Sequence, residues 1–242
     1  MGLRSKFNRV IKPLIGYYIG KARYGADLWQ DAVSLCGPAA GIVFDVGANE
    51  GESALNFLEL FPDATVYSFE PLPEAYASLQ AMARLRTRLV PVNVALGAEH
   101  GLAVLNQNAL QTTSSVLPTA PSSRAFLGGP ALSTQRQVHI SITTLDAFTA
   151  EHKVGIIDLL KIDVQGYELE VLKGASLMLS SGRIRVIVLE VNFAPLYERQ
   201  ASFEEISTFL QSNGFHLSCL YDFAFSTRKE LMWCEALFCR GN

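Results

Sequence analysis

The 242-residue sequence lacks the features of several protein classes. It has no apolar run near the roughly 20 residues that a membrane-spanning helix needs, and no signal-peptide cleavage pattern. Its four cysteines show no C-x-x-C spacing and are flanked by apolar residues. Such cysteines are typical of buried free thiols in a reducing compartment. We therefore expect a cytoplasmic protein without disulfides or a thiolate metal site.

An overall basic excess is also missing, since the formal net charge is -3. Proteins that bind nucleic acid non-specifically usually carry excess Lys and Arg to neutralise phosphates, so we expect no nucleic-acid partner. The four histidines show no ligand spacing, and we expect them on the surface. They are His100, His139, His152 and His216.

Charge is unevenly distributed along the chain, because residues 1–26 contain six Lys or Arg and no Asp or Glu. Apolar residues recur there at spacings of three and four, which predicts an amphipathic helix with basic edges. We expect a basic amphipathic helical segment over residues 1–36, followed by one domain over residues 37–242. The helix would pack against that domain, and the alternative is peripheral membrane or partner contact through residues 1–26.

Apolar strands alternate with helical patterns over the rest of the chain, which is 49% apolar and 18% charged overall. Strands joined by helices form right-handed crossovers in a parallel sheet, so we expect an α/β fold. The last two strands are close enough in sequence to pair antiparallel. Predicted strands cover residues 42–46, 65–69, 89–96, 138–142, 156–164, 185–190, 215–221 and 231–239. Predicted helices include residues 26–35, 168–179 and the segment from Ser202 to Gly214.

The segment 107–137 differs from its surroundings because Thr, Ser, Pro and Gly dominate it. A long loop inside a compact domain is usually functional or disordered. Its place after the third strand predicts a substrate lid beside the cofactor, with a flexible insertion as the alternative.

The stretch IVFDVGANEGE at 42–52 has the pattern of a strand, a tight turn and a helix start. Gly47 and Gly51 permit positive φ or a close backbone approach, and Asn49 tolerates the left-handed region. The turn would present backbone N–H groups at a helix N-terminus. Such a place suits the polar end of a nucleotide-like cofactor.

Two acidic residues bear on the identity of that cofactor. Glu70 ends the second strand, where a carboxylate can accept both hydroxyls of an adenosine ribose. Asp45 precedes the glycine turn, and a negative charge there disfavours a pyrophosphate and suits a cationic amino-acid end. A strand-terminating Asp45 that only braces the turn is the simpler alternative. The third glycine of a dinucleotide fingerprint is absent, which weighs against a nicotinamide-dependent oxidoreductase, our first alternative function.

Acidic residues recur at the carboxyl ends of the predicted parallel strands. Asp45, Glu70, Asp163 and Glu190 all occupy such positions, where open α/β sheets bind ligands. Four carboxylates at equivalent positions predict a cationic, hydroxyl-rich ligand. Each could instead cap a helix or pair with a cation, as Lys161 could with Asp163.

Short motifs occur in a fixed order between about Ile42 and Gly214: VFDVGANEG, SFEP, NVALG, Ser114-Ser115, Thr144-Leu145-Asp146, LLKIDVQGYELEVLKGA and LEV. Each motif alone is weak, but in this order and spacing they resemble the FkbM family of S-adenosylmethionine-dependent methyltransferases. The resemblance implies a Rossmann-like class I methyltransferase fold, with a seven-stranded, mostly parallel sheet, helices on both faces and an antiparallel last strand. It also implies O-methylation of a small-molecule, natural-product or glycan hydroxyl, with S-adenosyl-L-methionine as cofactor.

Position by position, the resemblance implies a set of cofactor contacts. The methionine end would meet Asp45, Gly47, Asn49 and Gly51, the ribose would meet Glu70 and Pro71, and Asn93 and Ala95 would border adenine. Asp163 would lie close to the amino group and the transferred methyl. Gln165 is a departure, since the family commonly has an acidic residue there, as in KIDVEG.

A hydroxyl acceptor must lose its proton, so a base is needed in the cleft. The candidate catalytic residues are Asp163, Glu190 and, if burial lowers its pKa, Lys161. We expect no metal, although Asp163, Glu190 and Asn192 offer hard oxygen ligands that would suit magnesium. A second alternative function is a cofactor-binding scaffold without catalysis, docked through its basic amino-terminal segment.

Overall fold

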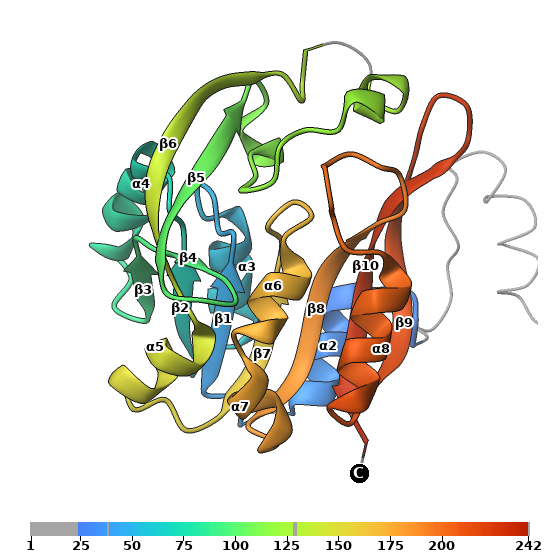
Figure 1. The fold of residues 1–242 in the computed structure, drawn as a ribbon. Coiled ribbons are helices and arrows are strands. Elements are labelled where there is room, and N and C mark those ends of the chain that lie inside the picture. The colour runs from blue at the N-terminus through green and yellow to red at the C-terminus, as the bar shows by residue number, and fades with distance from the viewer. Residues whose placement is uncertain (1–23, 38, 128–129, 242) are drawn as a thin grey trace, which may run out of the picture.

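The computed structural model describes residues 24–37, 39–127 and 130–241 (Figure 1). The amphipathic helix expected near the amino terminus falls almost entirely on residues 1–23, outside the described ranges. None of the described helices is long and apolar enough to cross a membrane.

A seven-stranded sheet forms the centre of the molecule, in the order β3-β2-β1-β7-β8-β10-β9. The first five strands of this order are parallel, and β10 is antiparallel to both of its neighbours. The predicted fold class is therefore confirmed, with one addition: the last strand lies between β8 and β9, so β9 forms the edge. The strands are β1 (Ile42–Val46), β2 (Thr65–Phe69), β3 (Leu89–Val92), β7 (Ile157–Ile162), β8 (Ile184–Asn192), β9 (Phe215–Phe225) and β10 (Leu231–Arg240).

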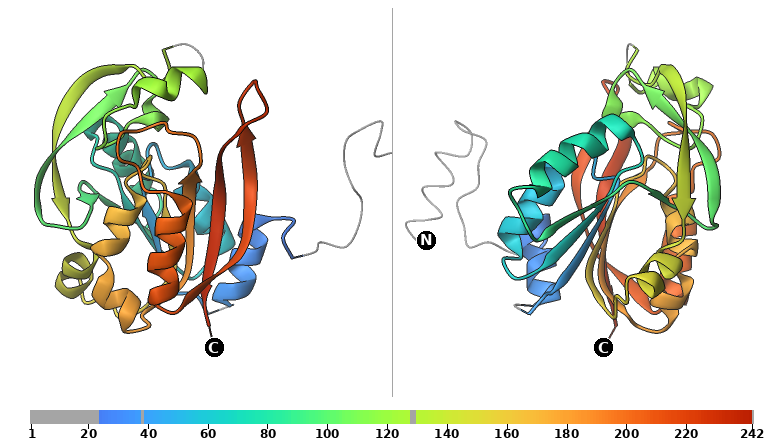
Figure 2. Two further views of the ribbon diagram at one scale, coloured as in Figure 1. Left: turned by 45° about the vertical axis from the view of Figure 1, so that its right-hand side comes forward. Right: turned by 90° about the vertical axis from the view of Figure 1, so that its left-hand side faces the viewer.

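Helices cover both faces of this sheet (Figure 2). One face carries α2 (Leu28–Cys36), α3 (Glu52–Leu60) and α4 (Pro73–Ala83), and the other carries α5 (Leu145–Glu151), α6 (Glu168–Lys173), α7 (Ser176–Ser180) and α8 (Phe203–Ser212). Every residue of β7 is buried, as expected for a central parallel strand covered on both faces. The α2 helix, which we predicted as part of the amino-terminal segment, buries Leu28 and Ala32 in the core against the large sheet.

The segment predicted as a third strand over residues 89–96 is two strands, which corrects that prediction. After β3 the chain leaves the large sheet, and β4 (Ala95–Leu96) joins a second sheet of order β4-β6-β5. Asn93 lies at the change of direction, where its amide donates hydrogen bonds to the carbonyl oxygens of Glu70 at 2.9 Å and Pro71 at 3.2 Å. These bonds hold the chain in its new course.

The second sheet also corrects the predicted loop over residues 107–137. The strand β5 (Gly101–Asn108) was not predicted, and β6 (Thr134–Thr143) begins four residues before the predicted Val138. Leu102 on β5 is 80% exposed, so the strand lacks the alternation that marks a half-buried strand. Between the two strands lie the short helical turns η1 (Gln111–Thr113) and η2 (Pro121–Ala125).

The helix predicted over residues 168–179 is divided into α6 and α7 around Gly174. A Cβ atom built at Gly174 would lie 1.9 Å from the carbonyl oxygen of Gly97, just after β4. The two helices therefore meet the end of β4 through backbone contact, which only glycine allows there. This contact joins the second sheet to the helical layer of the large domain.

Replacing Gly174 by Ala should therefore destabilise the protein by about 3 kcal/mol, because backbone on one side must move. The matched control is Gly155→Ala, where an added Cβ meets nothing within 4 Å. Urea unfolding of both variants measures the difference. Equal unfolding free energies for the two variants would contradict the close contact.

Candidate active site

A pocket opens where β1, β2 and β7 end, at the edge of the sheet predicted from the acidic strand ends. Its wall comes from the glycine turn, the FEP turn, β4, the η1 segment and the turn after β7. The lining residues are Val46, Gly47, Asn49, Phe69, Glu70, Pro71, Leu72, Val94, Ala95, Leu96, Leu105, Gln111, Thr112, Ser114, Ser115, Val116, Asp163, Val164, Gln165 and Tyr167. Segments distant in sequence therefore converge on one cavity with an apolar side and an acidic side.

The turn after β1 has the backbone expected from its sequence. Gly47, Asn49 and Gly51 have φ values of 79°, 47° and 95°. A Cβ on Gly47 would lie 1.9 Å from the carbonyl oxygen of Asp163, so this glycine lets the turn approach the protein's own chain after β7. A Cβ built on Gly51 would lie 2.7 Å from the Leu79 side chain of α4. The role of Gly51 is to let α3 and α4 pack together, and it does not line the pocket.

The Glu70 carboxylate lies in the wall of the pocket and is 6% exposed. One oxygen accepts the backbone N–H of Asn49 at 2.9 Å, and the other accepts that of Leu72 at 2.8 Å. Burial raises the pKa of Glu70 to about 7, against the lowering effect of these two hydrogen bonds. Each oxygen has a second lone pair, so the side chain keeps acceptor capacity for a ligand.

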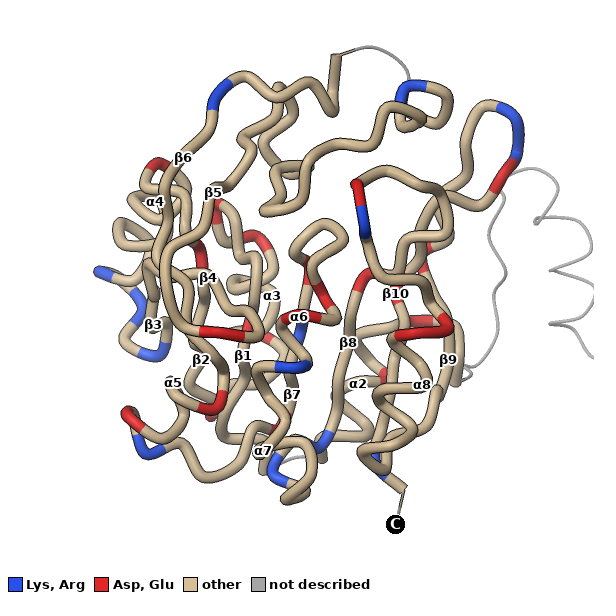
Figure 3. The backbone as a smooth tube through the Cα atoms, viewed as in Figure 1, with Lys and Arg blue, Asp and Glu red and all other residues tan. Residues whose placement is uncertain are grey.

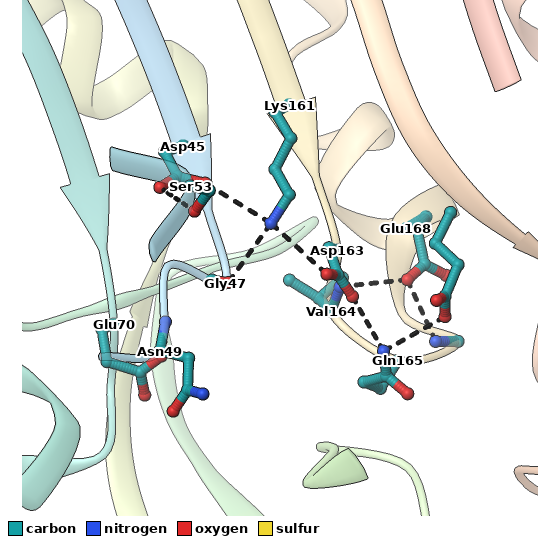
Figure 4. A network of polar contacts seen from close by, with 12 residues as sticks. Asp45, Gly47, Asn49, Ser53, Glu70, Lys161, Asp163, Val164, Gln165 and Glu168 are labelled. Carbon is teal, nitrogen blue, oxygen red and sulfur yellow. Dashed lines mark hydrogen bonds and ion pairs between the residues drawn. The ribbon is translucent and has the colours of Figure 1, made fainter. Parts of the chain in front are cut away.

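Lys161 lies between two carboxylates behind the pocket (Figure 4). Its Nζ is 3.4 Å from Asp45 Oδ1, 3.4 Å from Asp163 Oδ2 and 3.4 Å from the carbonyl oxygen of Gly47. Burial alone would lower the pKa of Lys161, but the negative charges of Asp163 and Asp45 outweigh burial and raise it. Lys161 is therefore a fixed cation, and the lowered pKa that a lysine base requires is absent.

Asp45 is fully buried, and its Oδ2 accepts the hydroxyl of Ser53 on α3 at 2.6 Å. It does not line the pocket. The geometry favours the simpler of the two sequence interpretations, in which Asp45 braces the turn, and it adds an ion pair between Asp45 and Lys161 that was not predicted.

Gln165 connects the two other candidate acids. Its Nε2 donates to Asp163 Oδ1 at 2.8 Å and to Glu190 Oε1 at 3.1 Å. The Asp163 side chain is 31% exposed and lines the pocket, whereas Glu190 is buried and does not. The NH2 group of one neutral amide therefore binds both carboxyl groups.

Further acids surround Glu190, and Figure 3 shows acidic residues gathered where the central strands end. We call Asp163, Glu168, Glu190 and Glu235 the acidic cluster. Burial raises the pKa of Glu168 to about 7, that of Glu235 to about 8 and that of Glu190 well above its usual range, and mutual repulsion adds to each shift.

The pocket includes part of the predicted site. Gly47, Asn49, Glu70, Pro71, Ala95 and Asp163 line it, whereas Asp45, Gly51, Asn93, Lys161 and Glu190 do not. Lys161 contacts both Asp45 and Asp163, and Asn93 supports the backbone of the FEP turn.

The sequence analysis missed several residues at the site. Gln111 lines the pocket and its amide donates to Asn49 Oδ1 at 3.0 Å. Tyr197 is 2% exposed, and its hydroxyl donates to Gln165 Oε1 at 2.8 Å. Glu168 accepts the N–H groups of Val164 and Gly166, both at 3.1 Å. A signal for Glu168 was present, since an acidic residue soon after a Gly turn can cap the turn.

No group of three or more His, Cys, Asp or Glu side chains in the described part of the chain is placed to hold a metal ion. Asn192 donates to Glu190 Oε1 at 3.5 Å, so its amide belongs to the hydrogen bonds around the acidic cluster. The described cysteines are all free, as predicted.

Comparison with known proteins gives matches that cover most of the chain. The model of the methyltransferase FkbM domain family matches residues 45–217. The 2-O-methyltransferase NoeI of Sinorhizobium fredii (strain NBRC 101917 / NGR234) is 30% identical over 189 residues, 76% of each protein. The 31-O-demethyl-FK506 methyltransferase FkbM of Streptomyces tacrolimicus is 30% identical over 193 residues, 72% of each protein.

A solved structure of M. capricolum TrmK with S-adenosylhomocysteine has a TM-score of 0.50 to this chain at 8% identity. The superposition covers 91% of this chain and 70% of that one. At this identity the likeness concerns the fold alone.

The raised pKa values of Glu70, Glu168 and Glu235 predict how stability depends on pH. Below the ordinary glutamate pKa these side chains are protonated in both the folded and the unfolded protein. Between that value and about 7 to 8, the folded protein holds protons that the unfolded chain releases. The free energy of unfolding should therefore fall as pH rises from about 5 to about 8.

Urea unfolding at a series of pH values measures this slope. Glu235→Gln should flatten it because one titrating group is removed, while Glu74→Gln, at an exposed position where Arg136 lowers the pKa, should leave the slope over this range unchanged. A urea midpoint that stays constant or rises between about pH 5 and about pH 8 would refute the raised pKa values of these glutamates.

Proposed function

The chain belongs to the FkbM family of methyltransferases, and from this membership we propose that it methylates a hydroxyl group of a small molecule, natural product or sugar. It is an S-adenosylmethionine-dependent methyltransferase, as the family is. This identification sets aside both the nicotinamide-dependent oxidoreductase and the non-catalytic scaffold. The choice of oxygen as acceptor atom is supported by two relatives, each 30% identical, whose names specify O-methyl positions.

The observation that carries the proposal is that Glu70 and Asp163 line the same pocket. The pocket residues fit S-adenosylmethionine, since Glu70 keeps acceptor capacity suited to two ribose hydroxyls. The apolar wall of Leu72, Leu105 and Val116 suits a flat base, and the partly exposed carboxylate of Asp163 suits an ammonium. Gly47, Asn49, Pro71 and Ala95 would complete the binding surface. When bound, the cofactor supplies a methyl group on a positively charged sulfur.

Asp163 is the residue best placed to take the proton of a hydroxyl acceptor. It is the member of the acidic cluster that lines the pocket, and the ammonium of Lys161 balances its charge at 3.4 Å. Glu190 is a poorer candidate because it is buried and does not line the pocket. Lys161 would then serve catalysis as a fixed positive charge that holds Asp163 in place.

The segment between β5 and β6 is proposed to cover the acceptor site. Gln111, Ser114 and Val116 line the same pocket as Glu70 and Asp163. Thr119 forms an isolated β-bridge with Tyr197, which ties this segment to the loop after β8. An acceptor entering beside Asp163 would meet both segments.

Glu70→Gln should weaken binding of S-adenosylhomocysteine by about 2 kcal/mol, roughly 30-fold in Kd. An amide NH2 would face one of the two backbone N–H donors and would lose acceptor capacity for the ribose. Calorimetry measures the change, with the exposed Glu74→Gln as the matched control on α4. An unchanged Kd in a variant that unfolds at the same urea concentration would remove Glu70 from the cofactor site.

The reaction is tested by incubating extracts of small molecules and glycans with the enzyme and isotopically labelled S-adenosylmethionine, followed by mass spectrometry. The label should appear on a hydroxyl oxygen. With that acceptor, Asp163→Asn should lose about 100-fold or more in kcat, the usual scale for a general base, while Glu190→Gln loses about tenfold or less. Near-wild-type turnover in both variants would refute the assignment of the base, and label on nitrogen would refute O-methylation.

A further inference from the structure

Gln165 lies in a turn and is held in place from three other parts of the chain, by Ser115, Glu190 and Tyr197. It has φ 58°, and Gly166 after it has φ 94°, so the chain turns sharply after β7 through two left-handed residues. The hydroxyl of Ser115 donates to the Gln165 carbonyl oxygen at 2.7 Å. Left-handed backbone is unfavourable for a residue with a long side chain, so these contacts hold the residue in a conformation that it would not adopt alone.

The side-chain amide of Gln165 uses both of its donor hydrogens and one acceptor position of its oxygen. Both hydrogens of Nε2 are directed to carboxyl groups, those of Asp163 and Glu190, and Oε1 accepts the hydroxyl of Tyr197. The reverse orientation of the amide would set its oxygen against two carboxyl oxygens. The environment therefore requires a neutral group with two donors on one side and an acceptor on the other.

Tyr197 is shared between Gln165 and the segment that covers the pocket. Its hydroxyl lies 2.8 Å from Gln165 Oε1 and 2.9 Å from the carbonyl oxygen of Thr113. A hydroxyl has one hydrogen, so it donates to one of these acceptors at a time. Burial, with the repulsion of Glu190 and Glu168, raises the pKa of Tyr197, and the hydroxyl therefore remains a donor at all physiological pH values.

These contacts fix the orientation of the Asp163 carboxylate. Lys161 approaches Oδ2 and Gln165 donates to Oδ1, so both oxygens of Asp163 are restrained from inside the protein. A base that is misplaced by about 1 Å can lose a factor of 100 in rate. Lys161 also binds Asp45. Gln165 is the partner of Asp163 that contacts the segment between β5 and β6, directly at Ser115 and indirectly through Tyr197.

We propose that Gln165 is a positioning residue for methyl transfer, which holds the Asp163 carboxylate in its working orientation and is itself set by Tyr197 and Ser115. The inference rests on the proposed role of Asp163 as base. It assigns to Gln165 a function distinct from that of a carboxylate at the same position, because the amide supplies donors where a carboxylate would supply acceptors.

The main variant is Gln165→Asn, because Asn tolerates left-handed backbone and its shorter amide cannot span the same partners. We expect kcat to fall roughly 100-fold. The Kd for S-adenosylhomocysteine, whose ammonium would also meet Asp163, should rise by a smaller factor, about tenfold or less. Tyr197→Phe should lower kcat roughly tenfold. In the double variant Tyr197→Phe should add little to the effect of Gln165→Asn, because it acts through that side chain.

The control is Tyr221→Phe, another buried tyrosine, whose hydroxyl donates to Asp31 at 2.8 Å; its kcat should equal that of the wild type. Ser115→Ala provides a second approach if Gln165→Asn unfolds, and should also lower kcat by a larger factor than it raises the Kd. Wild-type kcat in Gln165→Asn, or additive effects in the double variant, would overturn the inference. A wild-type enzyme that methylates no hydroxyl would instead reject the proposed function.

Discussion

The site depends on one buried ammonium group. Lys161 connects the ends of β1 and β7 by contacting Asp45, Asp163 and the carbonyl oxygen of Gly47, each at 3.4 Å. Among the described residues, no other Lys or Arg forms an ion pair with Asp45 or Asp163. Removing one partner of a buried ion pair leaves the other charge uncompensated, which costs several kcal/mol. The position of the glycine turn, the charge of Asp163 and the shape of the pocket between them therefore follow from the same three contacts.

Backbone packing adds a second constraint to this ion pair. Gly47 lies against the carbonyl group of Asp163, and Gly174 lies against that of Gly97. The first contact brings β1 and β7 together beneath the pocket, and the second attaches the small sheet that closes its far side. Because the η1 segment is carried by this small sheet, Ser115 reaches the turn after β7 with a hydrogen bond of 2.7 Å. A site assembled from remote segments is thus held by contacts that leave no room for a side chain.

Much of the fold could be predicted from the sequence, and less of the site. The apolar strands, the left-handed turn at Asn49 and the helix that begins after Ser202 follow from local patterns, and the structure confirms them. The second sheet was missed because Leu102 and its neighbours face solvent, so β5 has no clear period. The position of Glu70 followed from where strands end. That Asp45 is fully buried, or that Tyr197 reaches Gln165, depends on contacts between segments distant in sequence, which no local pattern contains.

Charge balance explains why a neutral residue occupies position 165. The acidic cluster and Asp45 together hold five carboxyl groups, and burial and mutual repulsion raise the pKa values of Glu168, Glu190 and Glu235. A carboxylate at position 165 would stand about as close to Asp163 and Glu190 as the Gln165 amide does, at 2.8 and 3.1 Å. It would need another proton or another cation to remain buried there. Gln165 avoids this requirement, because its amide binds both the partly exposed carboxylate of Asp163 and the buried Glu190 without adding charge.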